Sequence, residues 1–143
     1  MATINSMNLY HPIILQHHRQ PIGFEKRPTA AHIEDAYNPV CGDKYKLYLD
    51  FDHNIIQKIT FHGYGCAVSK ASASILTAKM IGKTIDEAIE ICESYFNMIQ
   101  NGVLTDDESL NVFEAARHFS GRLTCATLAW DALLPLLILK QKA

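Results

Sequence analysis

The sequence predicts an α+β fold in which a small antiparallel sheet precedes several helices, and two observations support this prediction. First, residues 44–51 and 55–63 alternate between apolar and polar side chains, as half-buried strands do. Second, apolar residues recur at helical spacing beyond residue 69, where helix-capping residues also appear. Strands followed by a run of helices are typical of α+β domains.

The length and charge of the chain indicate which kind of protein it is. With 143 residues it suits one domain with its own core, and we expect residues 1–143 to form a single domain. Its net charge of −2 gives no basic surface for nucleic acid. The N-terminus lacks a basic start followed by a long apolar stretch. The apolar segment 133–140 is shorter than the ~20 residues of a membrane span and contains Pro135. We therefore expect a cytoplasmic protein that contacts no membrane.

The predicted elements of the first half begin with a helix. Residues 8–18 place apolar side chains on one helical face, with Pro12 in the first turn. A loop of mixed polarity then runs to about Pro39. The two alternating segments follow, and the turn at 52–54 makes them an antiparallel hairpin.

Four further helices are predicted in the second half of the chain. Thr84 and Glu87 have the spacing of a capping box, and so do Thr105 and Glu108. Glycines end the first two of these helices, and a Ser-Gly pair precedes the last. The predicted helices cover residues 69–82, 84–102, 105–119 and 123–134.

The chain has four cysteines, Cys41, Cys66, Cys92 and Cys125. In a cytosolic domain of this size, metal binding or catalysis is favoured over disulfides. Cys92 shares an apolar helical face with its neighbours, which indicates a buried structural thiol. The other three lie at chain corners, namely before the first strand, in a glycine-rich segment after the second, and at the start of the last helix.

A hairpin would bring Cys41 and Cys66 to the same end of the sheet, because its second strand runs back toward the start of the first. Cys125 joins them if its helix N-terminus points at that edge, where the thiolate is favoured over the thiol. Three thiolates and Asp43 would form a four-coordinate set of the kind that zinc accepts, and Arg122 would offset part of its negative charge. Spacing alone leaves open the alternative that the three cysteines are unrelated small residues.

Three histidines are weaker candidates for the same site. His62 lies four residues before Cys66 and could be a ligand, but strand alternation puts it on the polar face as an ordinary surface histidine. His118 lies near the last helix. His17, on the first helix, is interpreted as a packing or capping residue.

Four segments resemble a known family. "LYHPIILQHHRQP", "NPVCGD", "GYGCAVSKASAS" and "GRLTCATLAWDAL" are similar to the U-type iron–sulfur cluster assembly proteins, the IscU-like and NifU N-terminal-like family, over nearly the whole chain. The resemblance implies a small antiparallel sheet of about three strands packed by several helices. It is closest to the SufU branch, because extra helical sequence separates Cys66 from Cys125 and Thr124 stands where IscU scaffolds have a histidine. The lysine that often precedes the third cysteine of SufU proteins is absent.

The resemblance to SufU implies a zinc-dependent sulfurtransferase. It implies that Zn²⁺ is held by Cys41, Asp43, Cys66 and Cys125. It also implies that Cys41 accepts persulfide sulfur from a SufS-type, pyridoxal-phosphate-dependent cysteine desulfurase and passes it to downstream iron–sulfur assembly proteins. A turn between Pro39 and Gly42 suits Cys41 to reach such a partner. The alternatives are a scaffold that binds iron or a [2Fe-2S] cluster at the same residues, and a zinc-stabilised binding module without sulfur chemistry.

Overall fold

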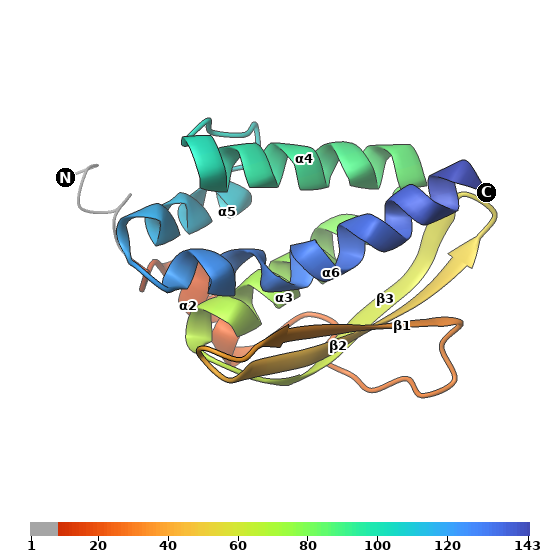
Figure 1. The fold of residues 1–143 in the computed structure, drawn as a ribbon, viewed down its shortest axis with the longest axis horizontal. Helices are drawn as coiled ribbons and strands as arrows, with labels where there is room; N and C mark the ends of the chain where they lie inside the picture. Colours follow the sequence, from red (N-terminus) through yellow and green to blue (C-terminus); the bar gives the residue numbers. More distant parts are fainter. Residues whose placement is uncertain (1–8) are drawn as a thin grey trace.

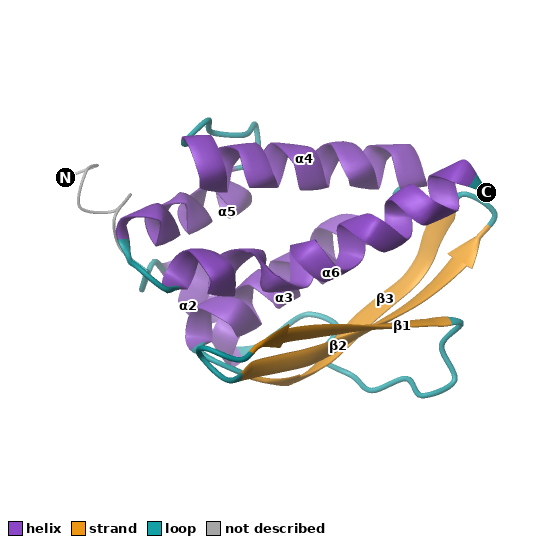
Figure 2. Ribbon diagram, in the orientation of Figure 1, coloured by secondary structure: helices purple, strands orange, loops and turns teal. Residues whose placement is uncertain are grey.

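The computed structural model describes residues 9–143 and has two layers, a three-stranded antiparallel sheet and the helices that cover one of its faces (Figure 1, Figure 2). Helices α3 and α6 lie on the sheet, and α4 packs on α6 farther from it. In chain order the elements are α2 (Pro12–Arg19), β1 (His32–Asn38), β2 (Asp43–Asp52), β3 (Ile55–Tyr64), α3 (Ala67–Met80), α4 (Ile85–Asn101), α5 (Glu108–Asn111), the 3₁₀ helix η1 (Val112–His118) and α6 (Arg122–Lys142). This confirms the predicted α+β class.

Strand order in the sheet is β1-β2-β3. Asn38 pairs with Asp43 across the first turn, and Lys44 pairs with Tyr64 at the end of β3. The β1–β2 turn and the exit of β3 therefore lie at the same end of the sheet. The hairpin of β2 and β3 confirms the two predicted strands.

Strand β1 was missed, because its segment was predicted as part of a loop. It is an edge strand whose larger apolar side chains, Ile33 and Tyr37, face outward and are exposed, whereas its buried positions hold the small residue Ala36 and the polar residue Asn38. The pattern that would mark a half-buried strand is thereby inverted. An edge strand gains its place from pairing with β2, not from its own hydrophobic pattern.

The core lies between the sheet and helices α3 and α6. The inward side chains of β2 and β3 include Tyr45, Leu47 and Phe61, all within 1% of full burial. Helix α3 is buried around most of its circumference and is rich in alanine and serine. Small side chains let it approach the sheet and α6 closely, which fits its central place in the fold.

The ends of α3 and α4 follow the sequence closely. Helix α3 begins two residues before the predicted Ser69, because Cys66 serves as its N-cap and accepts from the Ser69 N–H. Helix α4 has the predicted capping box of Thr84 and Glu87 and ends at Gly102, whose φ is 75°. The ends of α4 are local features, so its capping residues predicted them, whereas the Cys66 cap of α3 was not predicted.

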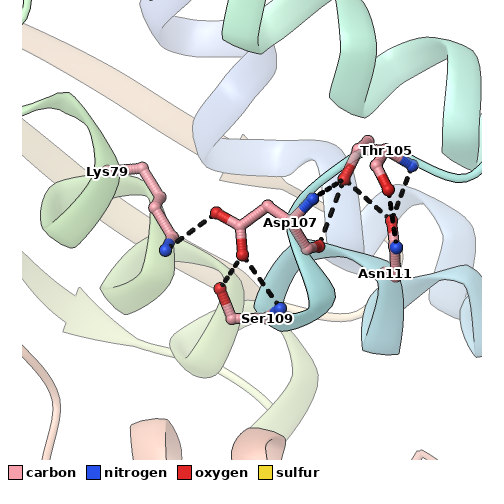
Figure 3. A network of polar contacts seen from close by, with 5 residues as sticks. All are labelled: Lys79, Thr105, Asp107, Ser109 and Asn111. Carbon is pink, nitrogen blue, oxygen red and sulfur yellow. Dashed lines mark hydrogen bonds and ion pairs between the residues drawn. The ribbon is translucent and has the colours of Figure 1, made fainter.

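The second predicted capping box, Thr105 with Glu108, is wrong. Asp107 caps the short helix α5 instead, and Thr105, in the loop before that helix, bonds Asn111 at its end (Figure 3). The Asp107 carboxylate also pairs with Lys79 of α3 at 2.8 Å. The local bond from the Ser109 N–H to Asp107 Oδ1, at 3.0 Å, caps the start of α5, and the remainder of the segment continues as a 3₁₀ helix.

Helix α6 runs eight residues past the predicted end at Leu134, from Arg122 to Lys142. Pro135 is exposed, so the backbone hydrogen bond that it cannot make is lost at the solvent side. Among the described residues, α6 is the one helix long and apolar enough to cross a membrane. Core helices of soluble proteins pass the same test, and half of its most apolar window is buried inside the protein. Helix α2 confirms the predicted first helix from Pro12 onward, with Pro12 in its first turn. The predicted start of that helix at residue 8 and the N-terminal segment before it lie outside the described range.

Candidate metal centre

The predicted ligands meet at the end of the sheet that carries the β1–β2 turn. Cys41 lies on that turn, Asp43 is the first residue of β2, and Cys125 lies in the first turn of α6. One ligand atom from each of these three residues lies within 4.8 Å of the other two. No other group of three potential metal ligands occurs among residues 9–143. Chain segments more than 80 residues apart therefore supply one compact cluster.

The turn that carries Cys41 is shaped by Asn38. The Asn38 side-chain oxygen accepts from the Val40 N–H at 3.2 Å, and its backbone oxygen accepts from the Gly42 N–H at 2.8 Å. Gly42 has a φ of 78°, a conformation that glycine adopts without strain. Cys41 is exposed, and its thiol lies 3.9 Å from the Gly121 carbonyl oxygen. The turn thus presents one thiol to solvent.

The Asp43 carboxylate is fully buried and hydrogen-bonded through both oxygens. Its Oδ1 accepts from the Cys66 N–H at 2.8 Å and from the Ser69 hydroxyl at 3.1 Å. Its Oδ2 accepts from the Cys125 thiol at 3.1 Å. A carboxylate needs such donors when it is removed from water.

Cys66 lies beside this group without belonging to it. Its residue is partly exposed, and its sulfur accepts from the Ser69 N–H at 3.4 Å as the N-cap of α3. Its thiol still interacts with that of Cys125, since Cys66 is among the groups that raise the pKa of Cys125. The structure therefore brings three of the four predicted ligands together and holds the fourth next to them.

The pKa of Cys125 is raised, and burial is the largest cause, followed by the bond to Asp43 and by Cys66. The expectation that the helix N-terminus favours its thiolate is wrong for the protein without a metal. Burial and a neighbouring carboxylate outweigh the helix dipole, because both disfavour a second negative charge. Arg122 is exposed, and its pKa is raised by its bond to Cys125 and by the charges of Cys66 and Cys41.

These contacts fit a cation. Cys125 Sγ and Asp43 Oδ2 lie 3.1 Å apart and share one proton. Sulfur and carboxylate donors are the ligands of zinc, and a bound metal replaces thiol protons when it binds. Cys41, Asp43 and Cys125 could therefore hold a metal ion, with Cys66 near enough to complete the set.

The remaining candidates lie elsewhere. Cys92 is fully buried, and burial raises the pKa of its thiol to about 12, which confirms a structural thiol. His62 stacks on Phe24 with ring centroids 4.4 Å apart. His118 lies 3.6 Å from Glu114, and His17 bonds Ser74 at 2.7 Å. None of these histidines belongs to the metal-ligand group.

Three residues at the site were not singled out from the sequence. Asn38 shapes the Cys41 turn, and its amide lies 4.0 Å from Cys125 Sγ. Ser69 bonds Asp43, and the buried Tyr45 hydroxyl lies 3.0 Å from Ser69 Oγ. Asn38 and Ser69 fall inside the quoted motifs, so their position beside the cysteines was a usable signal. Tyr45 has no such signal, because it alternates with its strand neighbours like any core residue.

Comparisons with known proteins agree with this arrangement. The family model described as "NifU-like N terminal domain" matches residues 9–135. The chain is 33% identical over 132 residues to the zinc-dependent sulfurtransferase SufU of Bacillus subtilis, covering 90% of this chain and 89% of that protein. It is 32% identical over 136 residues to the iron–sulfur cluster assembly scaffold protein IscU of Streptococcus pyogenes, covering 93% and 85%.

Solved structures give the same result for the fold. The SUF-system protein FiSufU of Fervidobacterium islandicum AW-1 aligns with a TM-score of 0.82 at 30% identity, covering 90% of this chain and 96% of that one. The N-terminal part of a NifU-like protein from Brucella abortus aligns with a TM-score of 0.83 at 18% identity, covering 97% of both chains, and at that identity it supports the fold alone. The chain therefore belongs to the family of NifU-like N-terminal domains, as its sequence motifs predicted.

Proposed function

We propose that this protein is a zinc-dependent sulfurtransferase of iron–sulfur cluster assembly. In this proposal Cys41 accepts persulfide sulfur from a SufS-type cysteine desulfurase and passes it to the proteins that build clusters. Support comes from the 33% identity to SufU of Bacillus subtilis and from Thr124, which stands where IscU scaffolds have a histidine.

The observation that carries the proposal is the contrast among the clustered thiols. Cys41 is exposed on a turn, whereas Cys125 is fully buried on a helix. A sulfur relay must touch the active cysteine of another protein, so only an accessible thiol can perform that step. The cluster thus offers one thiol for transfer and one that is suited to holding a metal.

The transfer step proceeds without net oxidation. The Cys41 thiolate attacks the outer sulfur of the desulfurase persulfide and forms a new S–S bond. The original S–S bond breaks, the desulfurase cysteine leaves as a thiolate, and Cys41 carries the persulfide. A second thiolate, on the acceptor protein, repeats the exchange and restores Cys41.

Cys41, Asp43, Cys66 and Cys125 would hold the zinc ion, which when bound keeps cysteine thiolates deprotonated at neutral pH. Arg122 supports the site by placing a positive charge beside the thiols. Asp43 would contribute the one hard oxygen ligand of this set.

A second candidate is an iron–sulfur scaffold that binds iron or a [2Fe-2S] cluster at the same residues. The 32% identity to IscU of Streptococcus pyogenes favours it almost as strongly as the SufU match favours sulfur transfer. The same ligand set serves either proposal, so the metal itself distinguishes them.

The test combines metal analysis with sulfur mapping. Aerobically purified protein should be colourless and contain about one zinc per chain, in line with sulfur-rich four-coordinate sites. After incubation with cysteine and a SufS-type desulfurase, alkylation and peptide mass mapping should locate the added sulfur on the Cys41 peptide. A brown protein that keeps a cluster through gel filtration would support the scaffold instead. Zinc-dependent folding with an unmodified Cys41 would support a binding module without sulfur chemistry.

A further inference from the structure

The two oxygens of the Asp43 carboxylate have different surroundings. Oδ1 is held from the protein side by the Cys66 N–H at 2.8 Å and by the Ser69 hydroxyl at 3.1 Å. Oδ2 faces the cluster and contacts the Cys125 thiol at 3.1 Å. Oδ1 is therefore already hydrogen-bonded to protein donors, and Oδ2 is the oxygen available to a metal ion.

The Ser69 hydroxyl reaches Asp43 as part of a longer chain of contacts. Ser69 Oγ has two acceptors at 3.1 Å, Asp43 Oδ1 and the Cys66 carbonyl oxygen. Serine has a single hydroxyl proton, so it can donate to only one of them at a time. The Tyr45 hydroxyl lies 3.0 Å away, and either hydroxyl of this pair could donate. When the serine proton goes to Asp43 or to the Cys66 carbonyl, the Tyr45 hydroxyl is the one that can donate to Ser69 Oγ.

Glycine at position 65 is required by the same arrangement. A Cβ atom on Gly65 would lie 2.5 Å from Asp43 Oδ1, 2.5 Å from Ser69 Oγ and 2.6 Å from the Tyr45 hydroxyl oxygen. Three oxygens thus converge on the bare face of one glycine. This close packing leaves them little room to move apart, and Tyr45 itself is 1% exposed.

We propose that Tyr45 and Ser69 are positioning residues of the metal centre: through one hydrogen-bonded chain they hold Asp43 Oδ1, so that the carboxylate binds a metal through Oδ2 alone. This inference rests on the zinc centre of the proposed function. Residues that orient metal ligands from outside the coordination sphere typically change metal affinity by 10–100-fold when they are removed. The inference gives a role to a tyrosine that would otherwise be only part of the core.

The test compares zinc affinity, by competition with a chromophoric chelator, across single and double variants. Tyr45→Phe removes one oxygen and should weaken zinc binding by about 10-fold. Ser69→Ala should weaken it at least as much, because it breaks the chain at its centre. If the two residues act in series, adding Tyr45→Phe to Ser69→Ala should cause no further loss. Tyr48→Phe is the matched control, since Tyr48 is a buried tyrosine of the same strand outside the site, and it should match the wild type.

Cobalt substitution gives a readout that a general loss of stability would not change. The sulfur-to-cobalt charge-transfer absorption should stay constant in Tyr45→Phe, because the thiolates are untouched. The ligand-field bands should shift, because the carboxylate binds differently. Circular dichroism checks that every variant is folded. If Ser69→Ala does not fold, Tyr45→Phe alone tests the positioning role.

The outcomes separate this inference from the proposed function. Wild-type zinc affinity and an unchanged cobalt spectrum in Tyr45→Phe would overturn the positioning role. Additive losses in the double variant would overturn the serial chain. Weakened zinc binding in the variants, with a wild type that accepts no sulfur, would support the inference and reject sulfur transfer. A wild type that binds neither zinc nor cobalt would overturn both proposals.

Discussion

Two buried thiols on neighbouring helices, Cys92 of α4 and Cys125 of α6, have the same exposure and different chemistry. Both side chains are fully buried, and burial is the largest cause of the raised pKa of each. Cys92 lies in the middle of its helix on an apolar face. Cys125 lies in the first turn of α6, where it meets Asp43 and the guanidinium of Arg122. Burial alone therefore does not mark a cysteine as structural.

The difference lies in which partners share the buried space. The thiol of Cys92 has no carboxylate or arginine bonded to it in the described structure, so nothing there favours a metal over a proton. Cys125 shares its proton with a carboxylate beside a second, exposed thiol. The N-terminus of a helix has unpaired N–H groups that attract polar neighbours, whereas a mid-helix position inside a bundle is surrounded by apolar side chains.

The largest expected effect comes from Cys41, the exposed thiol of the cluster. Cys41→Ser should abolish stimulated desulfurase turnover and persulfide transfer, because serine cannot form the new S–S bond. The measurement is sulfide or alanine release by the desulfurase, with circular dichroism to confirm folding. Cys92→Ser is the matched control and should retain transfer. Persulfide found chiefly on Cys66 or Cys125, with an active Cys41→Ser protein, would reject the assignment.

The next effect concerns Asp43 and should be partial. Asp43→Ala leaves the three cysteines but removes the oxygen ligand, so zinc should bind more weakly, by roughly 10-fold or more, without being lost. The rate of sulfur transfer should also change, because the hold on Cys41 changes. Zinc competition and single-turnover persulfide transfer measure the two effects. Wild-type zinc affinity together with a wild-type transfer rate would show that Asp43 is only a structural residue next to the turn.

A smaller effect should follow from truncating the structural thiol. Cys92→Ala removes one buried sulfur atom from the core and should lower the free energy of unfolding by roughly 1 kcal/mol. Denaturant unfolding of the metal-free protein measures this cost. Zinc content should be unchanged, and a stoichiometric loss of zinc in this variant would show that the ligand set was chosen wrongly.

The smallest effect is the pH dependence that Cys92 adds. Its pKa rises from the ordinary 9.0 to about 12 in the folded protein, so above pH 9 the unfolded chain loses this proton while the folded chain keeps it. The unfolded state then binds fewer protons, and stability falls as the pH rises. By pH 9.5 this group should cost about 0.8 kcal/mol. Unfolding at pH 7.5 and 9.5 should therefore show a smaller gap between wild type and Cys92→Ala at the higher pH, and a constant gap would contradict the assigned pKa.

Features that depend on neighbouring residues could be predicted from the sequence. The β2–β3 hairpin, the capping box at Thr84 and the helix end at Gly102 each depend on a few adjacent side chains, and all three are confirmed. The apolar stripe of α4 also placed Cys92 in the core. Periodicity and capping carry this information because they record local hydrogen bonds and one face of one element.

Features that depend on distant residues could not be predicted in the same way. β1 forms because it pairs with β2, and its own hydrophobic pattern does not mark it as a strand. The Tyr45–Ser69–Asp43 chain needs three side chains brought together around Gly65. The sequence by itself determined which residue types meet at the sheet end, through its motifs. Only the tertiary structure decided that Cys125 stays protonated beside Asp43 without a metal, because burial and charge depend on everything packed around a group.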